Sequence, residues 1–470
     1  MKYFHESEIS FLEGCQNNRF IVHFGKEGCS LMNKIGEISD QRFRKITPRN
    51  DGYFVVEKEF LVDTLIDENC RIICDDCQDI SEFSDDQIAL VVKRDGQKRW
   101  ITKEGFEFGE QFKDIGYFSG GFGPVALDNG KWSYIDKNMN VANVSFDLAT
   151  SFFENDHAIV VNDDKFYIIN KKFEIVSGPY HDVYFIDGDM VLVKHQDKSF
   201  AYYSVDGKKI SKDYKMCFGF DGDISMVESE QGVGYINRQG EEICEPKYKN
   251  VQHFGDKLGV IGCFDKNGEH TFAFVKKDGS ISQRWYPVAD VDHEGKASAM
   301  IGRKFYYLDE NLNPISKGYK RVGMFSNGVG TCEKPNGKSC YLDENFEEFG
   351  GEHDSVKTFG DGFGVVRNNG QYDAVSRAGL KLSKISEMAK KIELTPIKVL
   401  TLPEEFSNDK ETLLNLCNHA LEIIDFALDS DAYDDISKSQ FLGDKKLIEV
   451  LKMKTQSAIL QNQKTAKIYN

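Results

Sequence analysis

Short runs in which apolar and polar residues alternate recur along most of the 470-residue chain. Met190-x-Leu192 and Phe363-x-Val365 are examples, and turn sequences such as DGK, RQG and KDG separate such runs. Alternation with a period of two residues places every second side chain on the same face of a strand. The pattern therefore predicts many short antiparallel strands joined by tight turns.

One phrase organises these strands, and it reads GKWSYIDKN at 130–138 and GVGYINRQG at 232–240. It runs apolar, small or polar, aromatic or apolar, apolar, polar, two variable positions and usually Gly. We call its fourth residue the marker. The markers are Met32, Ile66, Ile101, Ile135, Ile169, Tyr203, Ile236, Val275, Leu308, Leu342 and Val375. Their spacing is 33 to 35 residues except for one interval of 39, which predicts a repeat architecture with three or four strands per unit.

A second segment recurs in each unit, as in Tyr248-x-x-Val251 and Tyr319-x-x-Val322. One unit cannot bury both of its faces, so neighbouring units must pack together. The aromatic residues that open the phrase are expected to fill the contact between units as core residues. They are Trp132, Phe200, Phe272 and Phe305.

The phrase and the Pro-x-Tyr-x-x-Val segment at 246–251 together resemble the WG-repeat family. The resemblance spans about residues 20–380, although no literal WG dipeptide is present and Ser133, Ala201 and Ala273 stand where the Gly would be. The resemblance implies a bacterial β-repeat protein of binding or scaffolding type. It supplies no catalytic residue to carry over.

The predicted fold is an all-β repeat array of about eleven units of 34 residues, built as a curved or superhelical stack of small antiparallel sheets. A β-propeller-like closure is the alternative, since ordinary propellers have four to eight blades. The long interval contains Asp265-Lys266-Asn267-Gly268, which predicts a hairpin turn that lengthens two strands. This insertion is interpreted either as a binding loop or as a tolerated surface loop.

The periodicity becomes helical after Ser383. We therefore expect a β-array over 1–380, a linker with a short helix over 381–407 and an α-helical hairpin over 408–470. Its first helix would begin at Asn408, with Glu411 completing a capping box, and its second would be capped by Asp444. The first helix is too apolar for one buried face, so the hairpin would either cap the last β-unit or bind a partner or a second copy.

Charge and targeting signals narrow the function. The net charge is −17, and the segment 381–470 holds 13 Lys against 14 Asp and Glu, so −16 belongs to the array. Nucleic acid and anionic membrane surfaces are therefore disfavoured as partners. The N-terminus MKYFHESEIS has no apolar signal region, and no apolar stretch is long enough to span a membrane, so a cytoplasmic location is expected. The eleven scattered cysteines are expected to be reduced thiols.

Candidate chemistry is sparse. Cys70, Cys74 and Cys77 have the C-x3-C-x2-C spacing of a cluster-binding site, but they fall inside the second repeat, where Cys70 takes the turn-Gly position. On an extended strand Cys74 and Cys77 would face opposite sides, so packed thiols are the simpler interpretation. His181, His253 and His353 lie at or near the Tyr-x-x-Val segment, and paired aspartates such as Asp75-Asp76 lack the calcium-loop pattern. No residue is assigned a catalytic, cofactor-binding or metal-binding role.

The sequence favours a non-enzymatic scaffold or adaptor that binds a protein partner through its acidic β-surface. Self-association through the C-terminal helices is a further possibility. Two alternatives stay open: a hydrolase-type enzyme with a carboxylate site in a concave face, and a metal or cluster protein that uses Cys70, Cys74 and Cys77.

Overall fold

The computed structural model describes residues 2–5, 9–59, 62–394 and 409–429, together with 445, 448, 449, 452, 455 and 456. The chain forms two compact units. Unit 1 comprises Met1–Pro48, Glu68–Cys70 and Phe325–Asn470, and unit 2 comprises Arg49–Asp67 and Arg71–Met324. Each unit is described by itself below.

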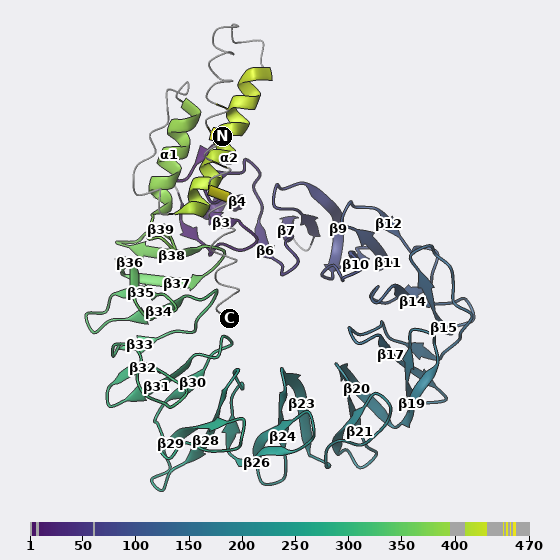
Figure 1. Ribbon diagram of the computed structural model, residues 1–470. Helices are drawn as coiled ribbons and strands as arrows, with labels where there is room; N and C mark the ends of the chain where they lie inside the picture. The colour runs from purple at the N-terminus through teal and green to yellow at the C-terminus, as the bar shows by residue number, and fades with distance from the viewer. Residues whose placement is uncertain are drawn as a thin grey trace. The chain divides into compact units, whose positions relative to one another are not determined.

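Unit 2 consists of small antiparallel sheets that follow one another in chain order (Figure 1). The first set is β7 (Phe54–Glu59), β8 (Val62–Ile66), β9 (Ile72–Ile80), β10 (Ile88–Lys93), β11 (Lys98–Thr102) and β12 (Glu107–Phe108). Next come β13 (Asp114–Ile115), β14 (Phe122–Ala126) and β15 (Trp132–Asp136), then β16 (Leu148–Ala149), β17 (His157–Asn162), β18 (Lys165–Asn170) and β19 (Ile175–Tyr180). The third group is β20 (Asp182–Asp187), β21 (Met190–Lys194) and β22 (Phe200–Ser204), then β23 (Met216–Asp221), β24 (Ile224–Glu228), β25 (Val233–Asn237) and β26 (Glu242–Tyr248). The last are β27 (Asn250–Val251), β28 (Leu258–Phe264) and β29 (His270–Lys276), then β30 (Ala289–Val291), β31 (Ala297–Ile301) and β32 (Lys304–Leu308), with β33 (Arg321–Val322) after them.

Unit 1 combines the two ends of the chain. Its N-terminal part holds β1 (Lys2–Tyr3), β2 (Phe11–Leu12), β3 (Phe20–His23), the 3-10 helix η2 (Gly25–Glu27), β4 (Cys29–Met32), β5 (Glu37–Ile38) and β6 (Lys45–Pro48). Its C-terminal part holds β34 (Gly330–Glu333), β35 (Ser339–Leu342), β36 (Glu348–His353), β37 (Ser355–Phe359), β38 (Phe363–Asn368), β39 (Gln371–Ser376), α1 (Leu382–Leu394) and α2 (Lys410–Asp429). The expected all-β repeat array with a small helical C-terminal segment is confirmed. The choice between a superhelical stack and a propeller-like closure stays a prediction.

Every marker lies on a strand, which confirms the period inferred from sequence. All of the markers are buried except Tyr203, which is half-buried. The fourth residue after each marker, where the phrase usually has Gly, adopts a positive φ in all eleven units. Where Gly is absent, Cys70, Met139, Phe173, Leu312 and Phe346 take this left-handed conformation with φ between 62° and 65°. The turn geometry is thus kept even where the residue is sterically unfavourable.

The residue just before the marker joins one sheet to the next. At this position Tyr134, Tyr235 and Tyr341 are fully buried, and each hydroxyl donates to a backbone carbonyl 16 or 17 residues further on. Trp100 does the same through Nε1 to the Gly116 oxygen, over 2.8 Å. A buried Tyr or Trp needs a partner for its polar tip, and this contact supplies it between consecutive sheets.

Among the aromatic residues that open the phrase, Phe200 is buried in a hydrophobic cluster as predicted, whereas the other three are less buried than expected. Trp132, Phe272 and Phe305 are only half-buried, and each forms a backbone bridge with the aromatic residue 14 positions later. The seam is filled instead by the pre-marker aromatic residue. The predicted structural role is confirmed, but except at Phe200 the fully buried aromatic residue lies two positions later than predicted.

The C-terminal helices pack onto the β-strands of unit 1. Leu382, Ile385 and Ala389 of α1 and Leu416 of α2 belong to one hydrophobic cluster with residues of β2, β3, β38 and β39. This packing agrees with a capping role for the helices. Asp409 accepts the Thr412 N–H over 3.0 Å at the start of α2, while Asn408 and most of the expected second helix, including Asp444, lie outside the described residues.

The insertion near residue 265 forms the expected hairpin. β28 and β29 pair over seven residues each, from Leu258↔Lys276 to Phe264↔His270. The turn between them is closed by Gly268 N–H to the Asp265 oxygen, over 3.0 Å. Phe264 near its tip is 53% exposed and contacts the ring of His270.

Candidate functional site

Cys74 and Cys77 lie side by side on β9, although the sequence predicted that they face opposite sides. Their Sγ atoms are 3.0 Å apart, and the residues are 3% and 0% exposed. Cys77 is opposite Asp63 on β8 and Cys74 is opposite Leu65, so three steps along β9 match two along β8. Asp76 adopts φ 55° at this irregularity. The β-bulge cancels the alternation and directs both thiols into one hydrophobic cluster.

Cys70 does not take part in this thiol pair. It occupies the turn position with φ 62°, and its thiol donates to Ser39 Oγ within unit 1. Among the residues that the structure describes, no three His, Cys, Asp or Glu side chains are grouped so that they could hold a metal ion. The three cysteines thus do not form one site, because Cys70 is a turn residue and only Cys74 and Cys77 lie together.

A lysine and a glutamate complete the surroundings of the pair. Lys93 of β10 places Nζ 3.3 Å from Cys74 Sγ and 2.5 Å from Glu107 Oε1 of β12. Arg99 of β11 holds the other carboxylate oxygen over 3.0 Å. Three neighbouring strands, β10, β11 and β12, therefore each contribute one charged side chain to the group around the buried dithiol.

The charges around the dithiol shift its titration. A hydrogen bond from Cys77 lowers the pKa of Cys74 below its ordinary value, and the Lys93 charge lowers it further against the opposing effect of burial. The same hydrogen bond, together with burial, raises the pKa of Cys77. Burial alone would lower the pKa of Lys93, but its hydrogen bond to Glu107 and the thiols raise it. The surroundings therefore favour deprotonation of Cys74 over that of Cys77.

A second polar cluster lies on the turns of later repeats in unit 2. The rings of His253 and His293 are 4.7 Å apart, and His253 Nδ1 contacts the Asp221 carboxylate. Burial raises the pKa of the nearby Asp290, and the Asp292 charge raises it further, while the two imidazoles act in the opposite direction. A carboxyl group with a raised pKa next to imidazoles is a combination suited to proton transfer.

The other candidate residues are structural or exposed. His353 is buried, donates from Nε2 to the Gly350 oxygen and accepts at Nδ1 from Asn368, as expected for a packing residue. His181 is exposed. Among the acidic pairs, Asp163 and Asp164 form a turn with positive φ, and the pair at 434–435 lies outside the described residues.

Large apolar side chains of unit 2 are exposed at or near the first strands of six sheets, although the sheet β27–β29 contributes none. Each lies in, or within two residues of, β13, β16, β20, β23, β30 or β33. We call these residues the edge row: Tyr117 (58% exposed), Leu148 (46%), Tyr184 (53%), Met216 (39%), Phe218 (40%), Val288 (40%) and Met324 (56%). Isolated exposed apolar residues are common on proteins, but their recurrence at the first strands of six sheets is unusual.

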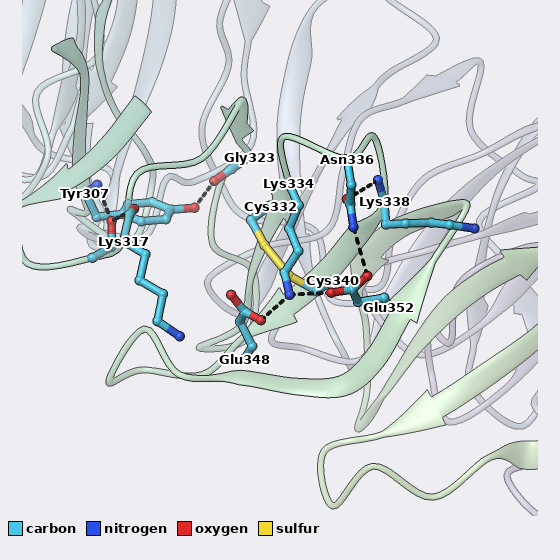
Figure 2. The surroundings of a disulfide bond; sticks show 11 residues. Tyr307, Lys317, Gly323, Cys332, Lys334, Asn336, Lys338, Cys340, Glu348 and Glu352 are labelled. Carbon is cyan, nitrogen blue, oxygen red and sulfur yellow. Dashed lines mark hydrogen bonds and ion pairs between the residues drawn. A yellow bond between two sulfur atoms is a disulfide. The ribbon is translucent and has the colours of Figure 1, made fainter. Parts of the chain in front are cut away.

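Two cysteines of unit 1 form a disulfide, which corrects the expectation that all thiols are reduced. Cys332 of β34 and Cys340 of β35 are directly opposite in the strand register, with Cα atoms 5.5 Å apart. Figure 2 shows the bond and, near it, Lys334 between the carboxylates of Glu348 and Glu352, at 2.5 and 2.7 Å. The sequence signal was present, because the two cysteines flank the turn KPNGK at equal distances.

Lys93, Glu107 and Asp290 were not recognised from the sequence. Lys93 and Glu107 come from strands that follow the cysteines by 16 and 30 residues, so only the strand pairing brings them to the thiols. Asp290 sits among many aspartates, and only burial distinguishes it.

Within the part of the chain that the structure describes, no helix combines the length and apolar character needed to cross a bilayer. No curated protein matches the chain. Several solved structures match it weakly. AztD from Citrobacter koseri aligns with a TM-score of 0.27 and 13% identity over 77% of this chain and 95% of that one. BamB from Moraxella catarrhalis aligns with a TM-score of 0.24 and 9% identity, over 72% of this chain and 92% of that one. The WD40 β-propeller domain of Doa1 aligns with a TM-score of 0.23 and 14% identity, over 48% of this chain and 88% of that one.

These TM-scores are too low to support an argument about fold or function. The family comparison is more specific, because residues 234–280 match the family model described as WG containing repeat. The matched stretch includes most of the phrase at 232–240 and the Pro-x-Tyr-x-x-Val segment that follows it. Residues 234–280 therefore carry the WG containing repeat, which confirms the resemblance inferred from the repeated phrase.

Proposed function

We propose that the protein is a non-enzymatic scaffold that binds a protein partner along the first strands that carry the edge row of unit 2. The observation that carries this proposal is the edge row, in which large apolar side chains at or near the first strands of six sheets are 39–58% exposed. Such side chains gain free energy when a partner covers them. The strands that carry them are at sheet edges, where an extended peptide can pair with the backbone.

The charge of the array defines the partner further. Carboxylates lie on the same first strands, among them Asp114, Asp182, Asp187 and Asp221. The array holds nearly all of the net charge of −17. A partner with basic residues interspersed among apolar ones would be attracted and oriented by this surface, and nucleic acid would be repelled.

The test is affinity purification of the tagged full chain beside two variants. In the first, Tyr117, Tyr184, Phe218 and Met324 of the edge row are changed to Ser. In the matched control, four apolar residues that are exposed elsewhere are changed to Ser: Phe106, Phe264, Ile281 and Ile315, exposed by 68, 53, 37 and 44%. We expect a defined partner with wild type and control and its loss with the edge-row variant. Equal capture by all three proteins would contradict the proposal.

A hydrolase is the second candidate, and the raised pKa of Asp290 beside His253 and His293 is the observation that favours it. Asp290 would act as the general acid and an imidazole as its counterpart. Its test is hydrolysis of chromogenic ester, phosphoester and glycoside substrates by wild type, Asp290→Asn and the exposed control Asp278→Asn. Turnover that only Asp290→Asn abolishes would establish this candidate in place of the scaffold, and no turnover of any substrate would remove it.

Self-association through the C-terminal helices is a separate expectation. Leu413, Leu416 and Ala420 of α2 are already buried within unit 1, which reduces the apolar surface that these helices offer to a second copy. Light scattering on the full chain tests it directly. A monomeric mass would contradict self-association, and capping of the β-strands would then be the role of the helices.

A further inference from the structure

We propose that Cys74 and Cys77 are a redox-active dithiol that hydroperoxides oxidise to a disulfide. This site is independent of the edge row and of the proposed partner. It rests on the placement of two thiols, one lysine and one glutamate by three strands of one sheet, β9, β10 and β12.

The geometry prepares the pair for bond formation. The two Sγ atoms are 3.0 Å apart, and a disulfide needs about 2.05 Å, so a movement of about 1 Å suffices. The bulge at Asp76 is what removes the opposite-facing arrangement of a regular strand. The buried thiols of Cys29 and Cys217 contact the Phe43 and Phe200 carbonyl oxygens. Cys77 also contacts a backbone oxygen, that of Asp75, but it lies against a second thiol as well.

The charged groups assign different roles to the two sulfur atoms. Lys93 Nζ is 3.3 Å from Cys74 Sγ and stabilises its thiolate. Glu107 faces the same atom at 3.5 Å, but its charge is held by Lys93 and Arg99. Cys77 is fully buried, and its proton is shared with Cys74. Cys74 is therefore the attacking sulfur and Cys77 the resolving one.

The reaction has two balanced steps. The Cys74 thiolate attacks the terminal oxygen of the hydroperoxide, the O–O bond breaks, and the departing alkoxide or hydroxide takes a proton to leave as an alcohol or water. Cys74 is then a sulfenic acid. Cys77 sulfur attacks Cys74 sulfur, the S–OH bond breaks, and the hydroxide leaves as water with the Cys77 proton. One hydroperoxide is reduced and the two thiols are oxidised to a disulfide.

The pKa directions support this order. The hydrogen bond from Cys77 and the Lys93 charge lower the pKa of Cys74, whereas burial raises that of Cys217 to about 12 and that of Cys244 to about 11, so of these thiols Cys74 is the most easily deprotonated. Lys93 and Glu107 side chains are 14% and 25% exposed. These two side chains are partly exposed beside the buried thiols, which favours a small oxidant such as hydrogen peroxide.

The experiment treats the reduced full chain with hydrogen peroxide, then denatures it and alkylates the remaining thiols. Peptide mapping is expected to show that the fragment with Cys74 and Cys77 loses two hydrogens and escapes alkylation before the fragments with Cys217 and Cys244 react. In Cys77→Ser the reaction should stop at a Cys74 sulfenic acid, detected with dimedone. Reduction of the oxidised wild type should restore alkylation of both residues.

The matched variants test the role of Lys93. Lys93→Met should slow oxidation of the pair at least several-fold, because the charge next to Cys74 Sγ is removed. The fold should persist, because Arg99 still pairs with Glu107. Lys98→Met removes a lysine of the adjacent strand that pairs with Asp114 at 2.8 Å, and it should oxidise like wild type. Oxidation of Cys74 and Cys77 no faster than that of Cys217 and Cys244, or at the same rate in Lys93→Met, would overturn the proposal.

Discussion

At the residue scale, the repeat is held together by a side chain that reaches from one sheet to the next. Tyr235 is fully buried, and its hydroxyl lies 2.7 Å from the Gln252 oxygen and 2.8 Å from the Val260 oxygen. The sequence predicted the marker next to this residue but not the contact. A period identifies equivalent positions, whereas the partner of a polar tip depends on how consecutive sheets pack.

Replacing Tyr235 by Phe removes the hydroxyl and leaves these buried carbonyl groups with one donor fewer. We expect the free energy of unfolding to fall by about 1–3 kcal/mol, measured by urea denaturation. The control is Tyr117→Phe, whose side chain is 58% exposed. An equal effect of both substitutions would show that the buried hydrogen bond contributes nothing.

The recurring tyrosines also predict a pH limit. Burial raises the pKa of Tyr134, Tyr235 and Tyr341 above the ordinary value of 10.0. The unfolded chain therefore loses phenolic protons first as the pH rises, and deprotonation favours unfolding. Stability should be unaffected by these groups below about pH 10 and should fall above it. Urea denaturation between pH 8 and 11, followed by circular dichroism, measures this, and a flat profile would contradict it.

At the element scale, the strands could be predicted because alternation, turn residues and period agree. The bulge in β9 could not be predicted, because no residue type in Cys74-Asp75-Asp76-Cys77 requires it. Without the bulge, the two thiols were predicted to lie on opposite faces of the strand. The turn after each marker was predicted more fully, because Gly recurs there and the structure gives every such position a positive φ.

The turn at Gly240 depends on glycine for two reasons. Its φ is +78°, and a Cβ there would stand 2.4 Å from the Ile210 oxygen. Gly240→Ala should lower the free energy of unfolding by about 1 kcal/mol or more. Gly268→Ala separates the causes, because its φ is +80° but no atom lies within 4 Å of its Cβ. If Gly268→Ala lowers the free energy of unfolding as much as Gly240→Ala does, close packing against the preceding repeat does not explain the effect at Gly240.

The helices of unit 1 are predicted to stabilise that unit. Leu416 of α2 is 1% exposed within the cluster that includes β-strand residues. Leu416→Ala should reduce the free energy of unfolding by about 2–5 kcal/mol, measured by chemical denaturation. Its half-buried neighbour Asn415, changed to Ala, is the control. Stability unchanged by Leu416→Ala would mean that α2 does not cap the β-strands.

At the scale of the whole molecule, the sequence could predict the class of fold and the acidity of the array. It could not predict the edge row, because Tyr184 and Phe218 look like the buried aromatic residues around them, and both lie at register shifts that no sequence pattern marks. It could not predict the polar clusters either, since Lys93 and Glu107 meet the thiols only through strand pairing. Recurring residues were correctly interpreted as structural.

The central claim is that a partner binds along the first strands that carry the edge row of unit 2. Hydrogen exchange of the full chain, alone and with its captured partner, tests this most directly. The account predicts new amide protection concentrated in β16, β20, β23 and β30 and near Tyr117 and Met324. Protection confined to α1 and α2, or to the hairpin of β28 and β29, would contradict it.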